Sequence, residues 1–142
     1  MGGRQGEPVS RKRDGARNFF PLPNEIFNLG LSAGEIVVYA YLMFRENRKT
    51  YQCYPSYQTI GRAVGMSRNT VKKYVDGLVE KQLIYTEPTT VPTKDGKVRN
   101  GNLLYTIRPL DSAREYYVAR QVKAFEQQSI EMEQKRREGS PV

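Results

Sequence analysis

One stretch constrains the fold of this chain more than any other. It covers residues 55–84 and reads PSYQTIGRAVGMSRNTVKKYVDGLVEKQLI. Two sets of apolar residues recur in it at helical spacing, which predicts two short helices with one buried face each. The first set is Tyr57, Ile60, Gly61 and Val64, and the second is Val71, Tyr74, Val75, Leu78 and Val79. Gly65 stands between the sets, where a helix often ends in a left-handed residue that glycine adopts freely.

The residues around this turn suit a close crossing of the two helices. Met66 can fill the angle between them, and the small Gly61 allows a near approach. Ser67 is placed to cap the second helix by accepting from its free amide groups. At about 100° per residue, five polar side chains then fall in one outward arc about 140° wide. They are Arg68, Asn69, Lys72, Lys73 and Asp76.

A capped helix with a basic outer face has the shape of an element that enters the major groove of DNA. The alternative is an ordinary helical hairpin whose basic face is merely solvated. Two features favour DNA: the mutual spacing of Gly61, Gly65 and Met66, and a basic arc that begins at the first turn of the second helix. The stretch is therefore interpreted as a helix-turn-helix.

Composition limits the other possibilities. A chain of 142 residues with 38% hydrophobic and 27% charged residues fits one domain with tails. The longest apolar run, 36–44, is too short to span a bilayer, and no signal-peptide pattern is seen, so the cytoplasm is expected. With one cysteine and no histidine, we expect no disulfide, metal site, cofactor or enzymatic activity.

The positive charge is unevenly distributed. Residues 1–18 have a net charge of +3, residues 19–110 have +5, and residues 111–142 are neutral, although the whole chain carries +8. A basic excess gathered on one module is expected for a protein whose partner is a polyanion. Residues 1–18 are rich in glycine and charge and are expected to be disordered. That tail could contact DNA or could simply be solvated.

A first long helix is expected over residues 33–46. Ser32 and Glu35 form a capping-box pattern at its start. Its core-facing residues are predicted to be Val37, Ala40, Tyr41 and Phe44. An apolar lead-in over residues 19–31 should lie across the core as an extended stretch followed by a helical turn.

A β wing is expected after the second helix of the motif. Residues 83–87 and 102–108 read as two strands, and 50–54 can supply a third short strand. An Asp-Gly pair between the two longer strands favours a tight turn, across which 89–91 would pair with 97–99. The tip of this arm carries three cations, Lys94, Lys97 and Arg99, which could contact phosphates or a minor groove.

A C-terminal helix is expected over residues 111–137, with 138–142 disordered. Ser112 and Glu115 repeat the capping-box pattern at its start. A heptad seam runs through Val118, Val122, Phe125, Ser129 and Met132. It favours a homodimer through this helix. The alternative is that Tyr116, Tyr117, Val118 and Val122 pack back on the first helix.

At this point the sequence resembles the winged helix-turn-helix superfamily, with the GntR-type regulator motif as its nearest well-known form. The matching residues are Pro55, Ser56, Gly65, Met66, Ser67, Arg68, Thr70, Val71, Leu83 and Ile84. The resemblance implies that Arg68, Thr70 and Lys72 contact DNA. Gln58 stands where the family often has an arginine, the wing is longer, and no effector domain follows. A small-molecule effector is therefore not evident.

The stretch 19–109 also resembles small helix-turn-helix proteins of bacterial plasmids and conjugative elements. The stretches carrying this similarity are LSAGE, YPSYQTIG, SRNTVKKYV and NGNLLYTI. Relatives include regulators and replication initiators. Two alternatives to a transcriptional regulator therefore stay open: a DNA-binding component of replication or partition, and a winged domain that binds only protein.

The expected fold is mainly α with a small β wing, an α+β winged helix-turn-helix followed by a C-terminal helix. The domain should cover residues 19–110. Double-stranded DNA is the expected partner, and no membrane is expected. The predicted DNA-binding residues are Ser67, Arg68, Asn69, Thr70, Lys72, Lys73, Lys94, Lys97 and Arg99.

Overall fold

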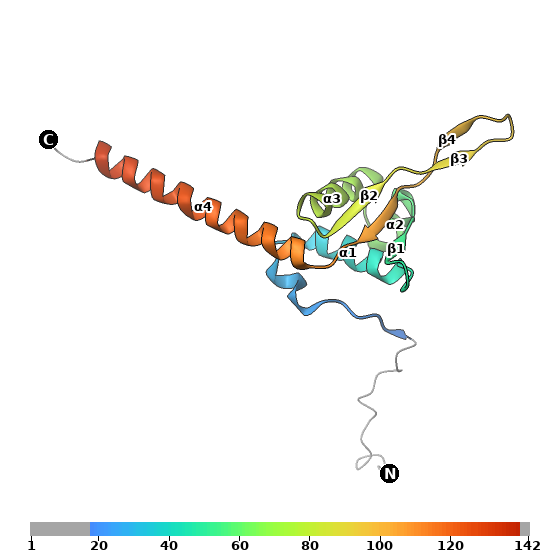
Figure 1. Ribbon diagram of the computed structural model, residues 1–142, viewed down its shortest axis with the longest axis horizontal. Coiled ribbons are helices and arrows are strands. Elements are labelled where there is room, and N and C mark those ends of the chain that lie inside the picture. Colours follow the sequence, from blue (N-terminus) through green and yellow to red (C-terminus); the bar gives the residue numbers. More distant parts are fainter. Residues whose placement is uncertain (1–17, 140–142) are drawn as a thin grey trace, which may run out of the picture.

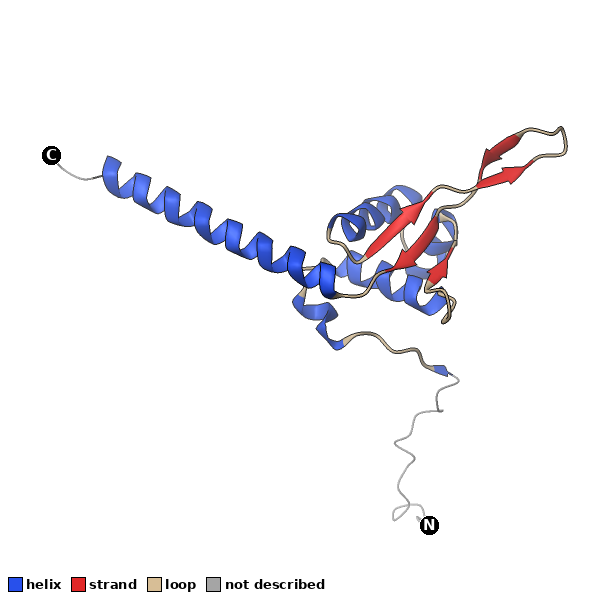
Figure 2. Ribbon diagram, in the orientation of Figure 1, coloured by secondary structure: helices blue, strands red, loops and turns tan. Residues whose placement is uncertain are grey.

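The computed structural model describes residues 18–139, so the predicted tails lie almost wholly outside the described residues. Figures 1 and 2 show a compact body of helices and a small sheet, from which a β-hairpin and a long helix extend in opposite directions. The elements in order are the 3₁₀ helix η3 (Asn24–Asn28), α1 (Ala33–Arg45), β1 (Gln52–Cys53), α2 (Tyr57–Val64), α3 (Arg68–Glu80), β2 (Ile84–Glu87), β3 (Thr90–Pro92), β4 (Val98–Asn100), β5 (Leu104–Ile107) and α4 (Asp111–Glu138).

Helices α2 and α3 bury the faces that their spacing predicts. Ile60 of α2 and the α3 residues Val71, Val75 and Leu78 are fully buried. Tyr74 and Val79 of α3 are partly buried and pack against the same core. Both helices lie against α1, which makes three helices around one apolar centre.

Helix α1 buries a different face from the one predicted. Its buried residues are Gly34, Glu35, Val38, Tyr39, Leu42 and Met43, whereas Val37 and Phe44 are exposed. Residues 36–44 form one unbroken apolar run, so periodicity alone does not select a face. The choice comes from α3: the ring of Tyr74 occupies the space that a side chain on Gly34 would need. Gly34, Val38 and Leu42, four residues apart, therefore face α3.

The sheet follows the predicted wing. β5 lies between β1 and β2, antiparallel to both, with Gln52 opposite Thr106 and Ile84 opposite Ile107. Beyond this sheet, β3 and β4 pair as a separate hairpin, in which Val91 lies opposite Arg99. The observed pairing, 90–92 with 98–100, lies one residue further along each strand than predicted. The result is a winged helix-turn-helix whose wing has a long distal arm (Figure 1).

Helix α4 has the predicted extent but not the predicted cap. It begins at Asp111 with Leu110 at the N-cap position, and no side chain caps it. The Ser112–Glu115 capping box is therefore wrong: the Ser112 hydroxyl lies inside the helix and accepts from the guanidinium of Arg108 at 3.1 Å. Every residue of α4 from Val118 onward is exposed. Val118 and Val122 therefore do not pack on α1, whereas Tyr117, named in the same alternative, is partly buried against the core.

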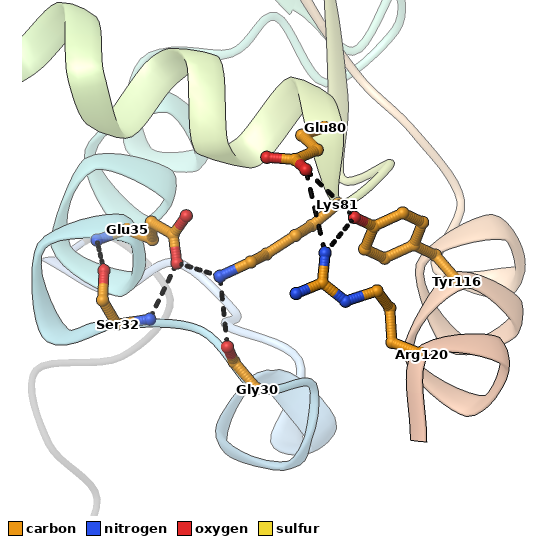
Figure 3. Close-up of polar contacts among 7 residues, drawn as sticks. All are labelled: Gly30, Ser32, Glu35, Glu80, Lys81, Tyr116 and Arg120. Atoms are coloured by element: carbon orange, nitrogen blue, oxygen red, sulfur yellow. Dashed lines mark hydrogen bonds and ion pairs between the residues drawn. The ribbon is translucent and has the colours of Figure 1, made fainter. Parts of the chain in front are cut away.

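Polar contacts hold the first turns of α4 to the end of α3 (Figure 3). The hydroxyl of Tyr116 donates to Glu80 at 3.3 Å, and Arg120 lies 3.8 Å from the same carboxylate. Beside them, Lys81 bridges the buried Glu35 at 2.7 Å and the carbonyl of Gly30 at 3.2 Å. Glu35 also completes the predicted capping box with Ser32. The root of α4 is therefore tied to the helical body, while residues 121–138 make no hydrogen bond or ion pair with the rest of the chain that the structure describes.

Candidate nucleic-acid interface

The turn between α2 and α3 determines how α3 is presented. Ser56 caps α2 by accepting from the Thr59 amide at 3.0 Å. α2 ends at Gly65, whose φ of 74° lies in the left-handed region predicted for it. The carbonyl of Met66 then occupies the space beside the Gly61 Cα, so the chain turns with the two helices nearly touching. This close crossing leaves the outer face of α3 uncovered.

Two predicted contact residues hold the start of α3 together. The Ser67 hydroxyl accepts from the Thr70 amide at 3.2 Å and donates to the Thr70 Oγ1 at 2.9 Å. Ser67 is therefore the N-cap that the sequence predicted. The next two residues, Arg68 and Asn69, are exposed, and their side chains make no hydrogen bond or ion pair with any other described residue. They stand at the end of α3 that reaches base edges in this type of motif.

The two lysines of α3 have different surroundings. Lys72 Nζ lies 2.7 Å from the Asp76 carboxylate one turn later, and both side chains are exposed. This hydrogen bond to Asp76 raises the pKa of Lys72. Lys73 Nζ lies 5.5 Å from the centre of the Tyr74 ring, a cation–π distance. Asp76 therefore offsets part of the positive charge of the arc, which is concentrated at Arg68 and Lys73.

The distal hairpin carries the remaining predicted residues at its tip and edge. Lys94 and Lys97 stand in the turn, Arg99 stands in β4, and all three are exposed. Asp95 stabilises the turn by accepting from the Thr93 hydroxyl and from the Lys97 amide at 3.3 Å. The hydrogen bond from Thr93 is the main reason that the pKa of Asp95 lies below its usual value. Gly96 supplies the positive φ of the tight turn, as the Asp-Gly pair predicted.

A cleft of about 190 Å³ joins α3 to the base of the wing. Arg68 lines it from α3, Gly101 and Asn102 from the wing, and Tyr57 from α2. The Asn102 amide group donates to the Tyr54 carbonyl at 3.2 Å, which orients it beside the cleft. Arg68 and Asn102 are far apart in the chain, so spacing could not reveal that they share one surface. Asn102 and Tyr57 belong to this surface, but the sequence alone did not predict them as DNA-binding residues.

The structure thus divides the nine predicted residues into two groups. Ser67, Arg68, Asn69, Thr70, Lys72 and Lys73 lie together on the first turns of α3. Lys94, Lys97 and Arg99 lie on the distal arm and not beside α3 (Figure 1). Guanidinium, ammonium and amide groups of this kind donate to phosphates and to base edges. Between residues 18 and 139 there is no group of acidic, histidine or cysteine side chains that could hold a metal ion, and no helix that could cross a membrane.

Comparison with known proteins agrees with this geometry. The family model described as a helix-turn-helix domain matches residues 29–84, which cover α1, α2, α3 and the start of β2. A search of curated proteins found no match. Among solved structures, one called "Possible transcriptional regulator from Methanosarcina mazei Go1" is similar over 75% of this chain and 80% of its own, with 13% identity and a TM-score of 0.49. That structural likeness is too slight to carry an argument. The match to residues 29–84 shows a helix-turn-helix domain, which is a DNA-binding fold.

Proposed function

We propose that this chain is a dimeric, sequence-specific DNA-binding regulator that represses transcription by occupying promoter DNA. The observation that carries the proposal is the exposed start of α3, where Arg68 and Asn69 make no hydrogen bond with other described side chains. An arginine can form two hydrogen bonds with guanine, and an asparagine can form two with adenine. Each such pair contributes about 1–3 kcal/mol of discrimination against a wrong base.

In this proposal the wing supplies affinity and α3 supplies specificity. Lys94, Lys97 and Arg99 contact phosphates or line a minor groove, where a cation carries little sequence information. Arg68 lines one cleft with Gly101 and Asn102 at the base of the wing, so the arm begins beside the start of α3. Arg68 therefore reads base edges while the arm of the wing follows the backbone.

Dimerisation through α4 is the second part of the proposal. Val118, Val122, Phe125 and Met132 lie on one seam and are each at least half exposed in the single chain. Beyond the Arg120–Glu80 contact, residues 121–138 continue as a helix of about 27 Å at 1.5 Å per residue. Pairing would bury this seam, and α4 leaves the body away from the wing, so the pair does not cover the arm (Figure 1).

The charges beside the seam favour a parallel pair. Val118, Phe125 and Met132 occupy d positions and Val122 an a position, which places Glu126 and Glu133 at e and Gln121 and Gln128 at g. In a parallel pair each glutamate faces a glutamine of the partner. In an antiparallel pair the glutamates face one another, which is unfavourable. A parallel pair also places both winged domains at the same end of the dimer, which suits a palindromic site.

Selection of bound duplexes from a random pool tests the base-reading role. The wild-type protein should enrich a motif with two related halves, and Arg68→Ala should lose preference at one position in each half. Lys123→Ala, which removes an exposed cation of α4, is the matched control and should leave the motif unchanged. Failure of the wild-type protein to enrich any motif, or an unchanged motif for Arg68→Ala, contradicts the proposal.

Mapping of bound sites across the source genome tests the biological role. Occupied promoters are the expected result. A single cluster of repeated sites at a replication origin would instead support a replication or partition component. Complete absence of binding to duplex DNA at low salt would leave a protein-binding role for the domain.

A further inference from the structure

A cavity of about 370 Å³ lies at the root of α4, away from the α3 surface. The wall of the cavity is largely apolar. Its residues include Tyr39, Met43, Tyr51, Ile107 and Leu110. These residues come from α1, the loop before β1, the end of β5 and the connection to α4. Small-molecule sites in proteins are commonly apolar hollows of roughly 300–1,000 Å³ with a few placed polar groups. This cavity has the dimensions and the lining of such a site.

Glu46 is the acidic group of this wall. It ends α1 as its C-cap and is only 8% exposed. Its Oε1 lies 3.2 Å from a guanidinium nitrogen of the half-exposed Arg48. Its Oε2 is buried and accepts no hydrogen bond from any residue that the structure describes. One oxygen of a buried carboxylate is thus left without a donor beside an apolar hollow.

Such a carboxylate oxygen is costly to bury unless something donates to it. Burial raises the pKa of Glu46, and the charge of Arg48 opposes that rise only in part. Burial also raises the pKa of the neighbouring Tyr39 to about 12, with the Glu46 charge as a further cause. The cavity therefore favours an occupant that brings a positive charge and hydrogen-bond donors.

The basic residue in the same wall is already committed elsewhere. The Arg108 guanidinium donates to the Gln82 side-chain oxygen and to the Ser112 hydroxyl. Arg108 therefore donates hydrogen bonds to those two groups and none to Glu46 Oε2. Arg108 keeps its charge and its other N–H donors, so it is the Glu46 carboxylate that disfavours an acidic ligand here.

We propose that this cavity binds a small organic amine. Its ammonium group donates to the Glu46 carboxylate once that side chain turns its buried Oε2 toward the cavity, and its apolar body lies against Met43, Ile107 and Leu110. The exposed ring of Tyr51 also lines the wall and suits a cationic guest, because aromatic rings attract cations. The volume admits a compact body such as a single ring or a short alkyl chain. This site is separate from the DNA surface, and its occupancy can be measured without DNA, so it stands or falls independently of the proposed function.

Calorimetric titration with phenethylamine and hexylamine tests the site, with 2-phenylethanol and 3-phenylpropanoate as the neutral and acidic counterparts. The amines should bind with Kd values of about 1 mM or below, a range open to ligands of about seven to nine non-hydrogen atoms. The alcohol should bind at least tenfold more weakly, and the acid should not bind. Equal binding of amine and alcohol, or no binding of either amine, overturns the proposal, since the cavity is then an ordinary hydrated hollow.

Glu46→Gln tests the anchoring group, with Glu87→Gln, at an exposed residue of β2, as the matched control. Glu46→Gln should weaken amine binding at least tenfold, while Glu87→Gln should leave it unchanged. Amide chemical shifts of the wild-type protein provide a readout that does not depend on the folding of a variant. Shifts caused by phenethylamine should cluster at Tyr39, Met43, Tyr51 and Leu110. A cluster elsewhere, or unaltered binding to Glu46→Gln, overturns the assignment.

Discussion

The carbonyl oxygen of Met66 occupies the space in which a side chain on Gly61 would begin. The two residues are also joined by a hydrogen bond, because the Met66 amide donates to the Gly61 carbonyl at 2.9 Å. No residue with a Cβ fits at position 61 unless the turn moves. The crossing of α2 and α3, and with it the presentation of Arg68 and Asn69, therefore depends on this glycine.

Gly61→Ala should lower the free energy of unfolding by about 2 kcal/mol, because the added methyl group collides with backbone that cannot yield locally. Gly65→Ala is the matched control. Nothing lies within 4 Å of an added Cβ there, so its cost should be about 1 kcal/mol, from the left-handed φ alone. Urea unfolding of both variants measures the difference. Equal losses would show that the crossing can relax.

Lys97→Ala should weaken binding to all duplexes alike, because its exposed ammonium at the wing tip is proposed to contact phosphate. The slope of log K against log salt should fall by about 0.9 for one lost phosphate contact. Fluorescence anisotropy across a salt series gives the slope for selected and random duplexes. Lys123→Ala should leave it unchanged. A loss confined to the selected sequence would assign base reading to Lys97.

Phe125→Glu should convert the dimer into a monomer, because the new charge falls on the proposed seam, where Phe125 is 70% exposed in the single chain. Sedimentation equilibrium measures the mass. Affinity for a two-half site should drop about 100-fold as the second contact is lost. Gln127→Glu adds the same charge at an f position and should remain dimeric. A wild-type protein that is monomeric at high concentration would rule out the α4 interface.

Glu46→Gln should make the protein more stable at pH 7 in the absence of ligand. A carboxyl group whose pKa is raised by folding stabilises the protein below its unfolded pKa and loses that contribution as pH rises through the folded pKa. The glutamine side chain is neutral at pH 7, so the variant avoids this loss of folding free energy. The loss is about 1 kcal/mol for one unsatisfied buried group. The difference between variant and wild type should shrink toward pH 4.5, as urea midpoints across a pH series can show. Destabilisation at pH 7 would mean that the Arg48 ion pair outweighs burial.

Cys53 should resist thiol reagents in the folded protein. It is 5% exposed, and its Sγ lies 3.6 Å from the Leu42 carbonyl. Burial is the main cause that raises its pKa to about 11, so only about one thiol in a thousand is ionised at pH 8. Ellman's reagent should label one thiol per chain in urea and almost none without it. Fast labelling of the folded protein would show that β1 opens readily.

Local patterns predicted the elements well because each depends on residues close together in the chain. Ser56 and Ser67 cap the helices that follow them, and Gly65 and Gly96 adopt the positive φ values of their turns. The Ser112–Glu115 pattern failed for a reason outside its own helix. Arg108 binds the Ser112 hydroxyl, and the N-cap of α4 lies two residues earlier, at Leu110.

The sequence predicted the part of the candidate interface that lies on α3, but not the part that α3 and the base of the wing form together. Helical spacing was enough to place Arg68, Asn69, Lys72 and Lys73 outward. It could not bring Asn102 beside Arg68, because their shared cleft is lined by residues from α2, α3 and the wing, which are distant in the chain. The contacts of all these residues with DNA remain predictions.

By itself the sequence determined the helix-turn-helix stretch, the wing strands and the extent of α4, because caps, turns and apolar periodicity act over a few residues. The tertiary structure alone decided which face of α1 is buried, since the run 36–44 is apolar all round and Tyr74 must lie over Gly34. It also left the Glu46 oxygen beside a cavity built from four separate segments. Burial of that kind depends on packing between distant parts of the chain, which no local pattern records.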